Sequence, residues 1–150
     1  MVDLQTVSIA IASASVVVGV IYYALQLRNQ AKQRQTELVT RLYSTYASEE
    51  FQKEWFIFMT EETNDYNTYR KKYAVEFPPT AVFFNEIGVL LSKKLIDIDL
   101  VNSLFGGVIM RYWERLKPFL ESCRRELNSP KLGFGVEYLC NEIQKFQQGK

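Results

Sequence analysis

Few side chains in this sequence could do chemistry, because the chain contains no histidine. Without imidazole it has neither the commonest general base nor the commonest transition-metal ligand. Ser-His-Asp and Cys-His nucleophile systems and imidazole-based metal sites are therefore excluded. The remaining candidates are Glu86, which stands among apolar residues, and the thiols of Cys123 and Cys140. An exposed glutamate on a helix flank and two buried, reduced thiols are the simpler interpretations, with a disulfide or redox pair as the alternative for the cysteines.

Other short motifs lack the surroundings that their chemistry requires. Asp97 and Asp99 could supply oxygen ligands to a cation, but no calcium-loop spacing surrounds them, and helix capping is the simpler role. The glycines of "LFGGV" and "GFG" lack the lysine and the strand–loop–helix context of a phosphate-binding loop. The sequence therefore predicts no catalytic residue, no cofactor and no metal site.

The charge of the chain gives no indication of a nucleic-acid partner. It carries 18 Lys and Arg against 17 Asp and Glu, for a formal net charge of +1. The arginines between residues 111 and 125 are interleaved with glutamates, which is typical of a solvated helix face. A nucleic-acid-binding surface would need an excess of basic side chains, so we expect no nucleic acid among the partners.

The elements that must position these groups begin with an apolar N-terminal segment. Residues 4–27 contain no charged side chain. As a helix they would be about 36 Å long, which exceeds the roughly 30 Å hydrocarbon core of a bilayer. A secretory signal peptide would need a basic start, which "MVD" does not provide. We therefore predict an uncleaved transmembrane helix over residues 1–27.

The charges that flank this segment predict its orientation. Arg28, Lys32 and Arg34 follow it, whereas only Asp3 precedes it. The positive-inside rule then places the N-terminus outside and the C-terminal part in the cytoplasm, as a single-pass protein of the inner (cytoplasmic) membrane. Arg28 and Lys32 lie one turn apart and are expected to contact lipid headgroups.

Small and polar residues of the predicted span share one helix face, because they recur at spacings of three and four. These residues are Ser8, Ala12, Ser15, Gly19, Tyr22 and Gln26. In lipid such a face allows close approach of a second helix and hydrogen bonds across the contact. Helix association is the favoured interpretation, ahead of a plain anchor and of a polar pore lining.

The remainder of the chain has helical periodicity, so we expect an all-α fold. Residues 28–47 are predicted to form a polar juxtamembrane stalk that continues the span, as one helix from about Leu4 to Tyr46. Residues 48–150 are predicted to form a small cytosolic helical bundle. Its helices are expected near residues 49–59, 66–73, 80–92, 100–127 and 136–147.

Specific packing predictions concern the central helices of this domain. Val82 and Phe83 are among the core candidates of the apolar helix that Thr80 opens. Gly106 and Gly107 interrupt the longest helix at a cost of roughly 1 kcal/mol each relative to alanine. We therefore predict a close helix crossing there, against Gly88 of the preceding helix. Pro118 is expected to kink or restart the long helix.

Three segments carry a resemblance to a known family: "VVVGVIYYALQLRNQAKQRQ", "FFNEIGVLLSKKLIDIDLVNSLFGGVIMRYWERLKPFLESCRRE" and "GFGVEYL". Through them the chain resembles an uncharacterised prokaryotic family, the DUF4760-type proteins, classed as a domain of unknown function. The resemblance implies a single N-terminal span and a helical cytosolic domain. It implies no activity, cofactor or catalytic residue, and residues 60–79 match only loosely.

Three hypotheses follow from the sequence. The leading one is a non-catalytic, membrane-anchored interaction, scaffold or accessory-subunit protein, whose partners are membrane lipid and either itself or another membrane protein. The alternative is an oligomeric membrane effector or channel-like protein whose clustered spans perturb or conduct across the membrane. The third is an enzyme acting on a lipid or nucleotide through Glu86 or a cysteine.

Overall fold

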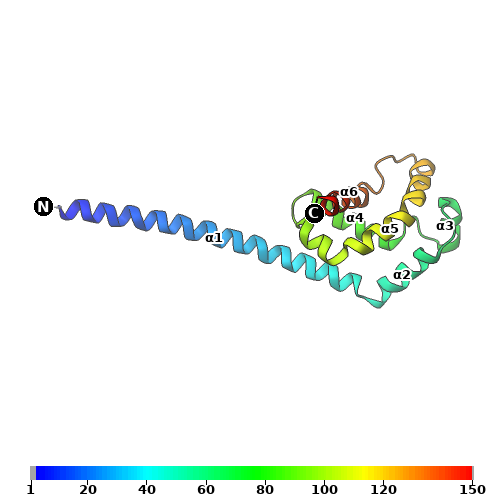
Figure 1. Cartoon of the computed structure of the whole chain (residues 1–150), viewed down its shortest axis with the longest axis horizontal. Helices are drawn as coiled ribbons and strands as arrows, with labels where there is room; N and C mark the ends of the chain where they lie inside the picture. Colours follow the sequence, from blue (N-terminus) through cyan, green and yellow to red (C-terminus); the bar gives the residue numbers. More distant parts are fainter. Residues whose placement is uncertain (1–2, 150) are drawn as a thin grey trace. The chain divides into compact units, whose positions relative to one another are not determined.

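The structure is a computed structural model that describes residues 3–149 of the chain. These residues divide into two units, with the boundary between Glu37 and Leu38. Helix α1, Leu4–Tyr46, contributes to both units (Figure 1). The described residues form six helices and no strand, so the all-α prediction and the predicted extent of the first helix are confirmed. The predicted span and domain also include residues 1, 2 and 150, which lie outside the described residues.

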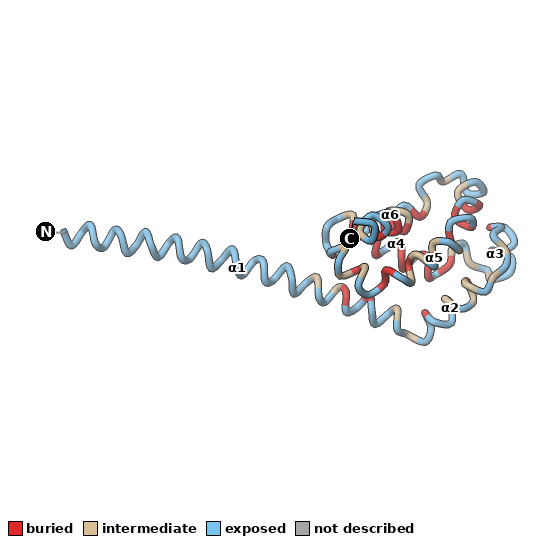
Figure 2. The backbone as a smooth tube through the Cα atoms, viewed as in Figure 1, coloured by how far each residue is buried: buried red, intermediate tan, exposed pale blue. Residues whose placement is uncertain are grey.

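In the first unit, all described residues from Leu4 to Glu37 belong to α1. All of residues 4–27 are exposed, as the uniform pale blue of this part of α1 shows (Figure 2). By length and composition α1 is able to cross a membrane, a test that a signal sequence near the N-terminus would also pass. None of the residues in its most apolar stretch is buried, so folding of the described chain leaves this surface uncovered.

The second unit is a helical bundle that includes the end of α1, where Val39 and Leu42 are buried. Its other helices are α2 (Glu49–Thr60), α3 (Tyr66–Tyr73), α4 (Pro79–Ser92), α5 (Ile98–Glu126) and α6 (Phe134–Gln148).

Local chemistry explains several helix ends in the bundle. The Ser48 hydroxyl accepts a hydrogen bond from the Phe51 N–H at 3.2 Å, as an N-cap of α2. The Asp65 carboxylate accepts one from the Thr68 N–H at 2.8 Å and caps α3. Pro79 stands at the start of α4, where its missing N–H costs nothing.

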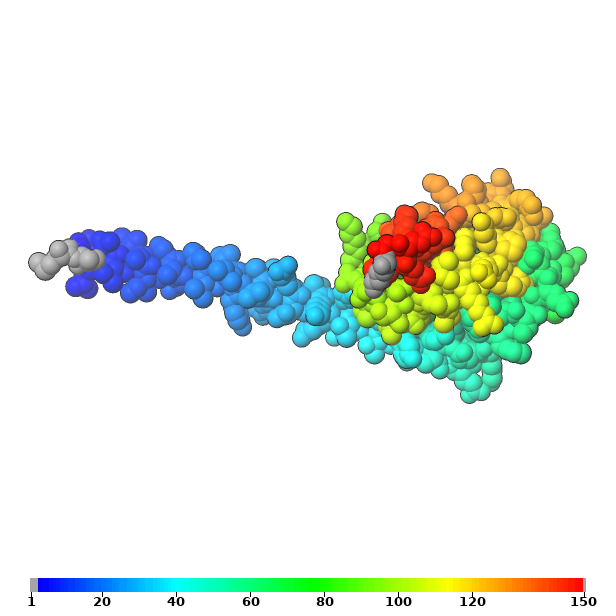
Figure 3. Space-filling model, in the orientation of Figure 1, coloured from blue at the N-terminus to red at the C-terminus, as the bar shows by residue number. Residues whose placement is uncertain are grey.

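The core of the bundle is rich in aromatic rings and centres on α5. Tyr112 is fully buried, with its ring centroid 4.9 Å from that of Phe84 and 5.2 Å from that of Phe58. Its hydroxyl forms a buried hydrogen bond of 2.8 Å with that of Thr80. Contacts of the Tyr112 ring with Phe58 and Phe84 therefore connect α5 with α2 and α4. Helix α6 also packs on α5: its atoms (red) lie against those of α5 (yellow) in the space-filling view (Figure 3).

Three packing predictions need correction. Val82 is 53% exposed and does not belong to the core, whereas Phe83 is buried. Helix α5 continues through Pro118, so of the two predicted outcomes, a kink or a restart, the restart is wrong. Gly107 has no atom within 4 Å of the position that a Cβ would occupy, so it forms no close crossing.

The close helix crossing involves Gly88 of α4 and Gly135 of α6. A Cβ on Gly88 would lie 1.8 Å from the carbonyl oxygen of Gly135, so the two backbones are in direct contact. Gly106 instead faces the side chains of Asn102 and Gln147. The Asn85 side chain adds to the crossing, because its Oδ1 accepts from the Gly135 N–H at 2.9 Å. The predicted partner of Gly88 was therefore wrong: α4 crosses α6 closely at this point, rather than α5.

Candidate functional site

The first candidate site is the face of α1 that the sequence predicts to associate with another helix. Its members Ser8, Ala12, Ser15, Gly19, Tyr22 and Gln26 are all exposed. The Ser8 hydroxyl donates to the Leu4 carbonyl at 3.0 Å, and that of Ser15 donates to the Ile11 carbonyl at 2.8 Å. Both hydroxyl protons are thus satisfied within the helix, which lowers the cost of placing them in an apolar environment.

Two further features of α1 bear on its chemistry. No side chain or backbone of another element lies within 4 Å of a Cβ built on Gly19, so a second helix has room to approach there. Arg28 and Lys32, the predicted headgroup contacts, are both exposed. Long basic side chains at this position can reach a bilayer surface.

The candidates for catalysis differ in exposure. Glu86 is exposed on α4, in agreement with the simpler interpretation. Cys123 and Cys140 are free and buried, and burial raises the pKa of both thiols to about 12. Because the thiolate is the nucleophilic form, such thiols are unreactive near neutral pH. Within residues 3–149 no cluster of three or more His, Cys, Asp or Glu side chains could hold a metal ion.

A different carboxylate, that of Glu61, has the most unusual surroundings in the bundle. Its side chain is only 6% exposed, in the turn between α2 and α3. One oxygen accepts hydrogen bonds from Lys72 Nζ at 2.8 Å and from the Tyr73 hydroxyl. The other accepts from the backbone N–H groups of Glu62 at 3.0 Å and Thr63 at 3.2 Å. All four of its usual acceptor positions are therefore filled.

These contacts fix the charge of Glu61. Hydrogen bonds from Lys72, then from Tyr73, lower its pKa from 4.5 to about 2, against the opposing effect of burial. A carboxylate with this pKa is a poor proton acceptor near neutral pH, where a general base works best with a pKa close to 7. Its filled acceptor positions leave no room for a ligand cation. Glu61 therefore has the properties of a structural anion that holds α3 against the end of α2.

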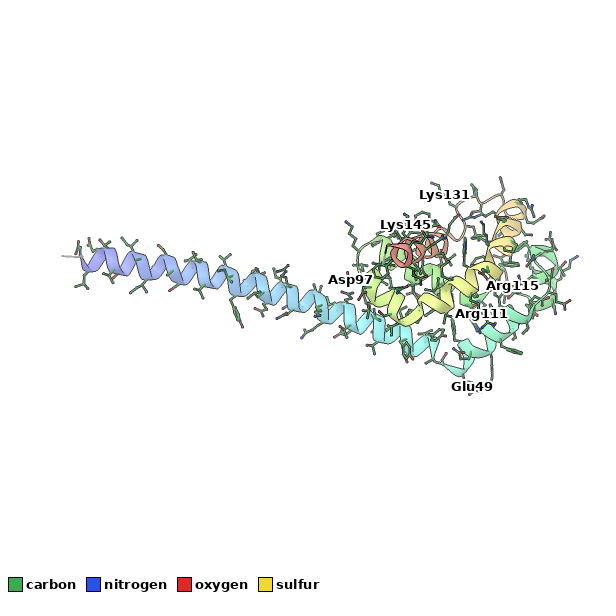
Figure 4. The ribbon with its side chains drawn as sticks, in the orientation of Figure 1. Glu49, Asp97, Arg111, Arg115, Lys131 and Lys145 are labelled. Carbon is green, nitrogen blue, oxygen red and sulfur yellow. The ribbon has the colours of Figure 1, made fainter. Side chains whose placement is uncertain are left out.

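The same turn is held from the other side by Arg115 of α5. One of its terminal nitrogens donates to the carbonyl oxygens of Glu61 at 2.6 Å and Thr63 at 2.9 Å, and the other donates to the Asn64 side chain. The guanidinium carbon also lies 4.9 Å from the ring centroid of Phe58. Figure 4 labels Arg115 together with Arg111, which lies one turn earlier on α5. The guanidinium thus joins α5 to the turn between α2 and α3.

Sequence reasoning missed this cluster for a physical reason. Glu61 lies in the polar segment between α2 and α3, and Lys72 and Tyr73 follow it 11 and 12 residues later in the chain. Because α2 ends at Thr60 and α3 begins at Tyr66, no single helical period connects Glu61 with Lys72 and Tyr73. Only the fold of the turn brings the three side chains together.

Glu61 should make the stability of the bundle depend on pH in the acidic range. Because its pKa is lowered from 4.5 to about 2 on folding, its contribution is fully present above about pH 4.5 and is lost as the pH falls toward 2. We expect Glu61→Gln to be less stable at neutral pH and to lose less stability on acidification. Urea unfolding midpoints of the full chain between about pH 6 and 2 measure both effects.

The exposed neighbour Glu62 provides the control for this prediction. Glu62→Gln should leave the pH profile of the unfolding midpoint close to that of the wild type. Parallel profiles for wild type and Glu61→Gln would contradict the role assigned to the Glu61 carboxylate.

Comparison with known proteins places the chain in a family but not with any characterised protein. No curated protein and no solved structure matches it. Residues 9–142 match the family described as a domain of unknown function, DUF4760, and this range covers most of the chain, including nearly all of the bundle. The chain therefore belongs to the DUF4760 family.

Proposed function

We propose that this protein is a single-span membrane protein whose helical bundle is a non-catalytic interaction module on the cytoplasmic side. Residues 4–27 anchor the chain, and the bundle binds a protein partner, either another copy or a different membrane protein. The observation that carries the proposal is the complete exposure of an uncharged helical segment of this length. Leaving so much apolar surface in water would be costly, so a bilayer is its expected environment.

The internal chemistry of the bundle supports a non-catalytic role. The Glu61 carboxylate, whose side chain is only 6% exposed, has all its acceptor positions filled, and both thiols are buried with raised pKa values. Active sites usually leave a titratable group accessible and shift its pKa toward neutrality. The groups with the largest pKa shifts here are shifted away from neutrality instead.

Flanking charge supports the orientation and the contact with lipid. Arg28, Lys32 and Arg34 follow the uncharged segment, and Asp3 precedes it. This asymmetry favours a cytoplasmic bundle. Arg28 and Lys32 then lie at the inner surface, where each basic residue near anionic lipid contributes about 1 kcal/mol to membrane attraction.

Membrane anchoring is tested by placing charge within the uncharged segment. Val16→Arg combined with Val20→Arg should move the protein from the carbonate-resistant membrane fraction to the soluble or aggregated fraction. Each arginine near the centre of a span costs about 2.5–3.5 kcal/mol. The matched control is Gln30→Arg combined with Gln33→Arg, at exposed positions beyond the segment, which should stay in the membrane fraction. A wild-type protein that carbonate extracts completely would contradict the proposed anchor.

Orientation is tested by maleimide labelling in intact cells. The natural thiols are buried and should react slowly with maleimide, so labelling should report mainly the engineered cysteines. Gln5→Cys should react with a membrane-impermeant maleimide from outside, and Lys131→Cys should react only after permeabilisation. The reverse pattern would overturn the proposed orientation and leave the anchor intact.

Association through the span is tested at its small-residue face. Gly19→Cys should form disulfide-linked pairs in native membranes on mild oxidation, and Ser15→Leu in the same chain should reduce the yield by at least about fivefold, because a larger side chain separates the helices. Val17→Leu, which lies on the opposite side of the helix, is the control. A Gly19→Cys protein that gives neither self-linked pairs nor links to another protein would contradict association through the span.

A further inference from the structure

The outer surface of α4 has an unusual pattern for a solvent-facing helix. Val82, Glu86, Val89 and Lys93 recur at spacings of four and three residues and are all exposed, so they form one row along the helix. The valines are 53% and 39% exposed. The opposite side of α4 is buried in the bundle, and Gly88 is in contact with α6. Within the described chain nothing covers this row.

The turn after α4 presents one more apolar side chain beside the row. Lys94 has φ of 57°, and the Leu95 N–H donates to the Leu90 carbonyl at 3.0 Å. This is the hydrogen-bond pattern of a Schellman motif, in which the hydrophobic residue after the cap commonly packs back on the helix. Leu95 is instead 52% exposed. The turn is held by backbone hydrogen bonds, so Leu95 and Lys93 have defined positions at the end of the row.

The two charges of the row are opposite in sign and have no ion-pair partner among the described residues. Some exposed charges on other helices of the bundle are paired: Lys53 with Glu49 at 2.7 Å on α2, and Lys145 with Glu142 at 2.8 Å on α6. Glu86 and Lys93 are about two helical turns apart, too far to reach each other well along one helix. The row therefore contains two unmatched charges of opposite sign, separated by Val89.

This spacing is complementary to itself in an antiparallel arrangement. A twofold axis midway between Glu86 and Lys93 passes near Val89 and Leu90. It brings Glu86 of each copy opposite Lys93 of the other, with Val89 of both copies at the centre. Val82 then lies close to Leu95 of the second copy, so an apolar contact closes each end. Self-complementarity of one patch about a twofold axis is the defining requirement of an isologous dimer interface.

We propose that the outer face of α4, defined by Val82, Glu86, Val89, Lys93 and Leu95, binds the same face of a second copy of this chain. The contact consists of two Glu86–Lys93 ion pairs around a central pair of valines. This proposal rests on the proposed function and names a second copy of the chain as the partner of the bundle. The α4 contact is separate from the contact through the span. A small surface of this kind associates weakly in dilute solution, and anchoring both copies in one membrane raises their effective concentration.

A cysteine at the centre of the face tests the contact in the full-length protein in native membranes. Val89→Cys should form disulfide-linked pairs under mild oxidation, because the arrangement places this position near its equivalent in the second copy. The buried natural thiols should contribute no background. Arg111→Cys, at an exposed position of α5, is the control reporter and should give no such pairs.

Charge reversal supplies the decisive comparison. In the Val89→Cys background, Glu86→Lys alone and Lys93→Glu alone should each slow cross-linking at least about tenfold, because like charges then face each other twice per dimer. The two reversals together should restore the rate to within about threefold of the parent. Glu114→Lys, an exposed reversal on α5, should have no effect.

Each result decides between the proposals. Slow cross-linking in both single reversals with rescue in the double reversal supports the α4 contact. Absence of Val89→Cys pairs, insensitivity to both reversals, absence of rescue, or an equal effect of Glu114→Lys would overturn it. Cross-linking at Gly19→Cys and membrane fractionation report the span separately, so loss of the α4 contact alone leaves the proposed function standing. The reversals are at exposed positions, and circular dichroism of each variant confirms that the fold is retained.

Discussion

Gly88→Ala is expected to lower the free energy of unfolding by about 3 kcal/mol. The added Cβ would lie 1.8 Å from the Gly135 carbonyl oxygen and 2.3 Å from its carbonyl carbon. Both atoms belong to backbone, so no side-chain rotation relieves the overlap. Helices α4 and α6 would have to separate, and the Asn85 hydrogen bond to the Gly135 N–H would be lost with the contact. Urea unfolding of the full chain in mild detergent measures the difference.

The matched control for this prediction is Gly107→Ala. Gly107 also lies within a helix, but nothing surrounds the position of its Cβ within 4 Å. Alanine should therefore stabilise the protein by up to about 1 kcal/mol, through helix propensity alone. The two substitutions are chemically identical and should differ in sign. A similar small effect at both positions would show that α4 and α6 do not cross at Gly88.

Local signals in the sequence predicted the helices of this protein well. Ser48 followed by acidic residues marked the start of α2, and the uncharged run of residues 4–27 marked α1. Helix propensity, capping side chains and local charge act within a few residues, so the helices that they favour can be predicted without knowing the fold. Helices α5 and α6 each begin two residues earlier than predicted, and their C-terminal ends differ from prediction by one residue, which is the usual uncertainty of helix boundaries.

Predictions about which helices touch were less successful, because contact partners depend on the whole arrangement. Helix α4 is apolar on most of its surface, so its pattern could not show that Val82 faces outward while Gly88 faces inward. The crossing partner of Gly88 lies near the start of α6, a loop and a long helix away, rather than in the helix that follows it. Sequence separation of this size carries no periodic signal.

The cluster around Glu61 and Arg115 could not be predicted for the same reason. The arginine was assigned to a solvated face, because glutamates surround it in sequence. In the structure its donors are used by backbone carbonyls of a turn more than 50 residues earlier. A search for catalytic groups favours side chains with recognisable spacing, whereas one nitrogen of Arg115 bonds only main-chain acceptors, which every sequence contains.

Arg115→Ala is expected to lower the free energy of unfolding by about 2–3 kcal/mol and to loosen the turn between α2 and α3. The substitution leaves the Glu61 and Thr63 carbonyls without their charged donor, and each unsatisfied polar group that stays away from water costs about 1–3 kcal/mol. The contact of the guanidinium with the Phe58 ring is lost as well. Denaturant unfolding measures the loss, and hydrogen exchange should show faster exchange of the backbone amides in residues 61–65.

Two further variants separate geometry from charge at this position. Arg115→Lys keeps the positive charge but cannot donate to two carbonyls and to the Asn64 side chain in one planar fork, so it should recover less than half of the lost stability. Arg111→Ala, an exposed arginine of the same helix, should change stability by less than about 0.5 kcal/mol. If Arg115→Lys matched the wild type in both stability and amide exchange, charge alone would hold the turn. The planar hydrogen-bonding pattern of the guanidinium would then have no special role.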